Sequence, residues 1–282
     1  SLIDEGIPVY PPDINHSKEK SAPYKDGVII GLSEVKGVKL TGQQIVQVRG
    51  DKPFMSRKEL IDRVRQKFGK DARLNSGALF GLVEAGAFDH FGERLGQAMM
   101  VRAPRAEGVF DTEWGVFERD ARQRRRLGFT VGDHPLQTGH RQLMSLLSVT
   151  DRSSLSKDWN LESKKDDSIV SLVAILTSLS VRDGRRSRYA LVSIEGPDRQ
   201  EYAGIMWASA VEEMEKHSPP PTEGLPVLVK GKVRHRVFST ETMQEDGTEV
   251  TEEVTQTEIV VSTLTPIKIP APRTPSRPTE FF

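Results

Sequence analysis

The spacing of apolar residues changes its period near residue 168, and this change limits what the chain can fold into. Before it, apolar residues recur every three or four positions; after it, they alternate with polar ones. The first period places residues on one face of a helix and the second on one face of a strand. A stretch rich in Ser, Asp and Lys at 150–168 separates the two parts. The sequence therefore predicts an α+β, multi-domain chain, with a helical region followed by an all-β region.

The helical part is expected to consist of short helices. Ser56 followed by Glu59 is a capping-box pattern that starts one helix, and Asn75 starts another that ends at Gly86. A polar, arginine-rich helix is expected from Trp114 to Leu127. Helices of this length are marginal alone and must pack on each other.

The β-rich part has a recognisable order of elements. Three strands, one helix and two further strands are expected, which is the order of a five-stranded OB-fold barrel. The strands are expected at 169–181, 189–194, 202–206, 227–237 and 258–261, and the helix at 208–216.

Charge and composition exclude several classes of protein. The 40 basic and 40 acidic residues cancel, so DNA could be bound only where basic residues cluster locally. The absence of cysteine excludes disulfide scaffolds and thiolate sites and is consistent with a cytoplasmic location. No apolar run reaches the ~18–20 residues that cross a bilayer. The N-terminus lacks a signal-peptide pattern and an initiator Met, so we expect a fragment or a processed piece.

Four strings in the first half of the chain form a recognisable set: GIPVYPPDIN at 6–15, GLSEVKGV at 31–38, LN with LVEAGAFD between 74 and 89, and LGF with GDHPL between 127 and 136. Together and in this order, they resemble the alpha subunit of bacterial DNA polymerase III, the family C replicative polymerase. The resemblance implies the end of the fingers at 1–30, a tandem helix-hairpin-helix region at 31–92, and a connecting segment with the basic helix at 93–167. It further implies an OB-fold at 168–267, and the proline-rich 268–282 is expected to be a disordered tail.

The resemblance also implies a function. The chain is expected to be a non-catalytic, DNA-binding C-terminal part of the polymerase, in a bacterial cytoplasm or nucleoid or in a phage-infected cell. It would bind single-stranded template and primer-template duplex, beside catalytic domains of the same or a separate chain. The parent would be a magnesium-dependent DNA-directed DNA polymerase. The family's catalytic aspartates and metal-binding histidines have no counterpart here, so no catalytic residue, metal ligand or cofactor is expected in this chain.

The sequence departs from the family's pattern at two places that bear on partners. Lys39 stands where the family hairpin has its second glycine. The sliding-clamp peptide should precede residue 112, but only Glu107-Gly108-Val109-Phe110 lies there, without the glutamine. A second candidate peptide for the clamp is the aromatic pair Phe281-Phe282; the alternative is a tail with no role.

The first candidate DNA contact is the hairpin of Gly37, Val38 and Lys39, whose backbone amides would bind phosphate. The alternative is an ordinary turn between helices. Around Gly86, a C-cap glycine next to a buried Phe88 is favoured over a second DNA contact. Arg122 and Arg125 on the basic helix are further candidates, against the alternative of a solvated surface.

The barrel supplies the remaining candidates. Four basic residues should project from one face of a strand, because they alternate with Val229, Gly231, Val233 and His235. They are Lys230, Lys232, Arg234 and Arg236. Arg182, Arg185 and Arg186 cluster on the first hairpin loop. An acidic loop is expected at 241–253 and would repel DNA. The alternative function is therefore a protein-interaction module of the replication complex with little DNA binding of its own.

Overall fold

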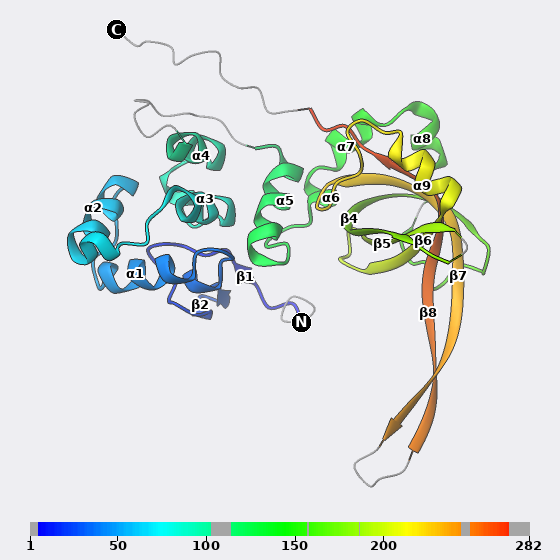
Figure 1. The fold of residues 1–282 in the computed structure, drawn as a ribbon, viewed down its shortest axis with the longest axis horizontal. Helices are drawn as coiled ribbons and strands as arrows, with labels where there is room; N and C mark the ends of the chain where they lie inside the picture. The colour runs from blue at the N-terminus through cyan, green and yellow to red at the C-terminus, as the bar shows by residue number, and fades with distance from the viewer. Residues whose placement is uncertain (1–4, 103–113, 157, 186, 244–248, 271–282) are drawn as a thin grey trace. The chain divides into compact units, whose positions relative to one another are not determined.

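The helical and the β-rich parts of the chain form separate units in a computed structural model (Figure 1). The structure describes residues 5–102, 114–156, 158–185, 187–243 and 249–270. The two units divide between Asp133 and His134. The boundary expected at 167/168 therefore does not coincide with this division, because residues 134–167 lie in the unit that contains the barrel.

The first unit begins with a small sheet in the order β1-β3-β2. Its strands are β1 (Val9–Tyr10), β2 (Ala22–Tyr24) and β3 (Gly27–Ile29), with β1 parallel and β2 antiparallel to β3.

Short helices follow the sheet, as the apolar spacing predicted. They are η1 (Leu32–Glu34), α1 (Lys39–Arg49), α2 (Arg57–Phe68), η2 (Gly69–Asp71), α3 (Ser76–Ala85), η3 (Asp89–Phe91), α4 (Arg94–Arg102) and α5 (Val116–Leu127). Both predicted N-caps are confirmed: Ser56 Oγ accepts a hydrogen bond from the Glu59 amide, and Asn75 Oδ1 accepts one from the Ala78 amide. The helices bury a common core that includes Leu32, Ile45, Leu60, Leu82 and Phe88.

The second unit contains three short helices and a closed barrel. The helices are α6 (Pro135–Thr138), α7 (His140–Leu146) and α8 (Val149–Ser154). The barrel elements are β4 (Ile169–Asp183), β5 (Arg188–Glu195), β6 (Glu201–Trp207), α9 (Ala208–Glu215), β7 (Pro226–Met243) and β8 (Glu249–Pro266).

The strand order of the barrel is β4-β5-β6-β8-β7, with β6 and β8 parallel and the other neighbours antiparallel. A helix lies between the third and fourth strands. This is the five-stranded OB-fold that the sequence predicted. Its interior holds residues from every strand, including Leu172, Val192, Met206, Val229 and Ile259.

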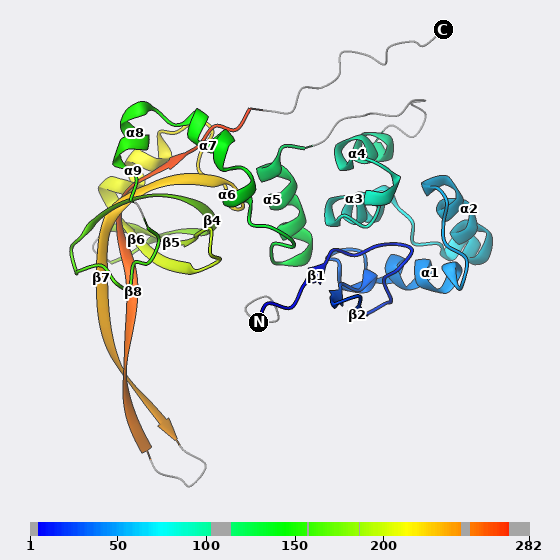
Figure 2. The same ribbon diagram turned by 180° about the vertical axis from the view of Figure 1, so that it is seen from behind.

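The last two strands are longer than predicted. The prediction of an acidic loop at 241–253 is wrong for much of this segment, because it belongs to the strands. β7 and β8 continue beyond the barrel as a two-stranded ribbon (Figures 1 and 2), and their pairing runs out to Met243 opposite Glu249. Valine and threonine occupy half of the positions from 249 to 258, and their preference for strands outweighs the charge in this segment.

Candidate nucleic-acid interface

The predicted hairpin lies between η1 and α1. Gly37 has a φ of 83°, a left-handed conformation that glycine adopts without strain. Val35 and Val38 are buried beside it, and the Val38 amide donates to the Val35 carbonyl oxygen at 3.0 Å, so Val38 itself offers nothing to a ligand. The side chain of Lys39 is exposed.

The hairpin leads directly into the N-terminus of α1. No side chain caps this helix end, and the first amides of an α-helix have no acceptor within the helix. The hairpin is also anchored from α5: the Lys36 amide donates to the Arg126 carbonyl oxygen at 2.9 Å, and Arg126 Nη1 donates to the Lys36 carbonyl oxygen at 3.3 Å. A fixed turn therefore presents amides beside an exposed lysine.

The second predicted hairpin is a helix end. Gly86 is the left-handed C-cap of α3, and its amide donates to the carbonyl oxygens of Leu82 and Val83. A Cβ at Gly86 would lie 2.4 Å from Arg94 Nη2, and Phe88 is buried. The interpretation as a C-cap glycine is confirmed.

The basic helix α5 uses several of its arginines internally. Arg122 Nη1 donates to Glu84 Oε1 at 2.8 Å, its Nη2 donates to Glu118 at 2.7 Å, and its guanidinium lies 4.4 Å from the ring centre of Trp114. This arrangement makes Arg122 a structural residue, and we do not retain it as a DNA contact. Arg125 is exposed on the same helix.

The basic residues of β7 point out of the barrel, as the alternation predicted, but acidic residues face three of them. Lys230 Nζ donates to Asp151 Oδ1 at 2.8 Å. Lys232 Nζ lies 3.8 Å from Asp167 Oδ1, and Arg236 Nε lies 2.7 Å from Glu258 Oε1.

The pairing of Lys230 also affects its acidic partner. The hydrogen bond from Lys230, and then that from the Ser148 hydroxyl, lower the pKa of Asp151. Arg234, between Lys232 and Arg236 on the outward face, is exposed.

The other predicted arginines lie at the hairpin between β4 and β5, but Arg182 belongs to strand β4, opposite Tyr189, and not to the loop. Arg182 and Arg185 are exposed, and Arg186 lies outside the described residues. The two candidate clamp peptides, at 107–110 and 281–282, also lie outside them.

An outward aromatic pair on the barrel was not predicted. Tyr189 on β5 lies opposite Trp207 on β6, and the side chain of Trp207 is 47% exposed. Their neighbours Ala190 and Met206 are buried, so both rings belong to the outer face. The alternation of β5 contains this signal, but the pair becomes visible only once the register of the two strands is known.

One row of outward residues runs across the neighbouring strands β5, β6, β8 and β7 and changes from apolar to basic. Leu191 pairs with Ile205, which pairs with Val260 on β8, which in turn pairs with Lys232 on β7. Leu191 is partly exposed and Ile205 and Val260 are half-buried. An apolar and aromatic surface therefore borders a row of positive charge.

The parts of the chain that the structure describes contain no cluster of three or more His, Asp or Glu side chains that could hold a metal ion. In the same parts, no helix is long and apolar enough to cross a membrane.

Comparison with known proteins agrees with this architecture. Residues 6–98 match the family model of the helix-hairpin-helix motif. The DNA polymerase III subunit alpha of Thermus aquaticus is 36% identical over 91 residues, which are 32% of this chain and 7% of that protein. The subunit alpha of Campylobacter jejuni is 26% identical over 253 residues, which are 76% of this chain and 20% of that protein.

The chain spans a fifth or less of the length of these curated relatives. A crystal structure of the mitochondrial single-stranded DNA binding protein Rim1 from S. cerevisiae aligns with a TM-score of 0.27 at 20% identity, over 37% of this chain and 98% of that one. A score this low adds nothing to the strand order, which identifies the OB-fold by itself. The chain is similar to the bacterial DNA polymerase III alpha subunit, and it resembles a C-terminal portion in which a helix-hairpin-helix motif precedes an OB-fold.

Proposed function

We propose that this chain is the non-catalytic, DNA-binding part of a family C replicative polymerase and that it holds template and primer DNA. The observation that carries the proposal is the outward pair Tyr189–Trp207, with the outward Lys232 and Arg234 two strands further round the barrel on β7. OB-folds bind single strands on the face of their second and third strands, which are β5 and β6 here.

On this face, bases would stack on the rings of Trp207 and Tyr189. Stacking is tolerant of sequence because every base presents a π-face. Lys232 and Arg234 would neutralise phosphates beside the stacked bases. Binding of this kind is electrostatic and carries no base-specific readout.

Other basic residues of the barrel have secondary parts in the proposal. Arg182 and Arg185, with the neighbouring Arg186, would guide the strand at the loop after β4. Lys230 and Arg236 lie 2.8 and 2.7 Å from Asp151 and Glu258, whereas Lys232 lies 3.8 Å from the exposed Asp167. Lys230 and Arg236 would therefore contribute less to the electrostatic attraction than Lys232.

The hairpin would bind the backbone of duplex DNA. Its Gly37 turn and the uncapped first turn of α1 present amides to a phosphate, with Lys39 as a point charge. Arg125 would be a further phosphate contact in this unit. Catalysis and magnesium would belong to other domains of the polymerase, and no chemical step is assigned to this chain.

Salt-titrated binding of labelled oligo(dT) tests the barrel face. If Lys232 and Arg234 each neutralise a phosphate, replacing both with Gln should flatten the log-log slope by roughly 1.4 units. Lys216→Gln with Arg141→Gln is the matched control, because it removes one exposed lysine and one exposed arginine outside the barrel strands of this unit. An equal slope for Lys232→Gln/Arg234→Gln and the parent chain would remove the DNA face and favour the protein-interaction function.

A further inference from the structure

The ribbon formed by the outer parts of β7 and β8 carries one sign of charge. From 239 to 258 the sequence contains no lysine, arginine or histidine. Its acidic residues are Glu241, Glu245, Asp246, Glu249, Glu252, Glu253 and Glu258. Such a segment repels a phosphate backbone and attracts a basic partner.

One edge of this ribbon has backbone groups that face away from its partner strand. The Val233 amide donates to the Ser168 carbonyl oxygen, and the Val233 carbonyl oxygen accepts from the Asp167 amide, so the backbone of Val233 points away from β8. In an antiparallel pair, two residues directly opposite each other either both direct their backbone N–H and C=O groups at the partner strand or both direct them away. The backbone groups of Ile259, opposite Val233, therefore point away from β7.

These directions repeat at every second residue, so the backbone groups of Thr255 and Thr257 also point away from β7. The pairing of β6 with β8 starts only at Ala203 opposite Glu258. This bridge occupies the Thr257 carbonyl oxygen, because Glu258 itself faces β7. Among the described residues, no strand covers the edge of β8 at Thr255 and at the Thr257 amide.

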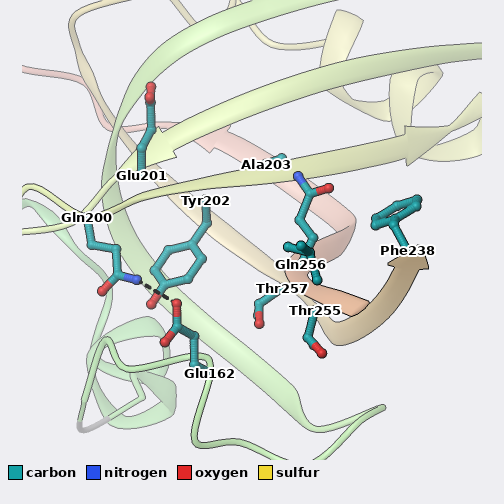
Figure 3. Close-up of a pocket in the computed structure, with 10 residues that line it drawn as sticks. Glu162, Gln200, Glu201, Tyr202, Ala203, Phe238, Thr255, Gln256 and Thr257 are labelled. Atoms are coloured by element: carbon teal, nitrogen blue, oxygen red, sulfur yellow. Dashed lines mark hydrogen bonds between the residues drawn. The ribbon is translucent and has the colours of Figure 1, made fainter. Parts of the chain in front are cut away.

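A groove of about 500 Å³ lies along this edge (Figure 3). Phe238 and Val254, which lie opposite each other on the ribbon, are 43% and 48% exposed at one side of it. Glu162 and Glu201 line another part, and none of the described residues that line it is basic. Glu162 accepts a hydrogen bond from Gln200, and Glu201 accepts one from the Thr177 hydroxyl.

The groove borders the proposed DNA face, but its charged residues are acidic, whereas the DNA face is aromatic and basic. Along β6 and its partner β5, the outward residues change from Trp207 and Tyr189 at one end to Glu201 and Glu195 at the other. The aromatic end suits stacked bases, and the acidic end does not.

We propose that the edge of β8 at Thr255 and Thr257 binds an extended, basic segment of a partner protein as an added strand. Main-chain hydrogen bonds would give affinity, and alternate side chains would give specificity. The stem of a lysine or arginine would lie on Phe238 and Val254, with its charge near Glu201 or Glu162. A second copy of the same ribbon is a poor occupant, because two acidic edges repel each other.

Peptide binding to the full chain tests the proposal. The probes are fluorescein-labelled octapeptides that alternate Lys with Val or Glu with Val, measured by anisotropy. We expect the Lys-Val peptide to bind at least about tenfold more tightly than the Glu-Val peptide, and methylation of its alternate backbone nitrogens to abolish binding.

Thr255→Pro removes an amide from the edge of β8 without removing a bond between β7 and β8, and it should weaken Lys-Val binding by about fivefold or more. Ser239→Pro is the matched control, because its amide faces the opposite edge of the same ribbon. Equal affinity of Thr255→Pro and the parent chain would overturn the proposal.

A second variant keeps the test decisive if Thr255→Pro lowers the melting temperature. Phe238→Ala with Glu201→Gln leaves the backbone intact and should also weaken the Lys-Val peptide; unchanged affinity would reject the groove. If these variants instead weaken labelled oligo(dT) and leave the peptide unaffected, the groove is a nucleic-acid site and the proposal is wrong.

Discussion

Arg126 Nε on α5 donates a hydrogen bond of 2.6 Å to the Glu84 carboxylate on α3, and Nη1 of the same arginine donates to the Lys36 carbonyl oxygen. Glu84 is only 1% exposed and also accepts from Arg122. One buried carboxylate therefore links α3 and α5 to the turn that contains Gly37. The shape of the proposed phosphate site depends on this link.

Removing that carboxylate should loosen the first unit. Glu84→Ala leaves two partly buried guanidinium groups without their partner, and we expect a loss of roughly 2–4 kcal/mol of unfolding free energy, somewhat below the value for fully buried pairs. Urea unfolding followed by the fluorescence of Trp114, which contacts Arg122, measures it. The exposed Glu93→Ala serves as control and should change by no more than about 0.5 kcal/mol. Parent-like unfolding of Glu84→Ala would contradict this account of the link.

Gly37→Val should weaken duplex binding. A β-branched residue resists the positive φ and blocks the approach of a phosphate to the backbone, at a conformational cost of about 1–2 kcal/mol. Gly50 has a φ of 52° in the same unit, so Gly50→Val carries a similar strain outside the hairpin. Electrophoretic mobility shifts with a duplex compare the two variants. Equal loss of affinity in both would assign the effect to strain and leave the hairpin without a DNA contact.

Lys39→Gln separates charge from conformation in the same hairpin. Because the side chain is exposed, its replacement should leave the chain folded. The log-log slope of duplex affinity against salt should flatten by about 0.9 if Lys39 contacts one phosphate. Anisotropy with a labelled duplex at several salt concentrations gives the slope. An unchanged slope would mean that Lys39 does not replace the family's second glycine as a phosphate ligand.

Trp207→Ala should reduce the affinity for single strands by about 1–3 kcal/mol, the usual contribution of one stacked base. The half-exposed ring contributes little to the barrel core, so the melting temperature should change little. Trp207→Phe retains an aromatic face and should restore most of the affinity for oligo(dT). The stacking role would be rejected if Ala and Phe at this position gave the same affinity as the parent.

Lys230→Gln should raise the pKa of Asp151, because the hydrogen bond from Lys230 is the largest cause of its lowered value. A carboxyl group with a lowered pKa in the folded state stabilises the fold above its unfolded pKa, and this stability is lost as pH falls through the folded pKa. The variant should therefore lose this contribution, and with it some resistance to acid. Carbon NMR titration of the Asp151 carboxyl measures the shift. An unmoved pKa would show that Lys230 is free to contact DNA.

Much of the fold could be predicted from the sequence, because its signals are local. The caps at Ser56 and Asn75, the C-cap at Gly86 and the alternation of β7 each depend on residues close together in the chain. The charge of Lys230 could not be evaluated in this way. Its partner Asp151 lies 79 positions earlier, and only the folded barrel brings the two together.

The candidate site was predicted less completely for the same reason. The alternation of basic residues in the sequence indicates Lys232 and Arg234, but the Tyr189–Trp207 pair becomes visible only with the register of two strands. Arg122 looked like part of a solvated or DNA-binding face, yet its partner Glu84 comes from another helix. Charge patterns along a helix do not show which residues tertiary contacts neutralise.

Intrinsic fluorescence tests the central claim most directly, because Trp207 is the exposed member of the three tryptophans while Trp114 is buried and Trp159 partly so. Oligo(dT) should quench the emission, the quenching should be lost in Trp207→Phe, and added salt should weaken binding with a slope of roughly −0.7 per phosphate contact. Quenching that persists in Trp207→Phe, or binding of oligo(dT) without any quenching, would contradict a single strand stacked on the β5–β6 face.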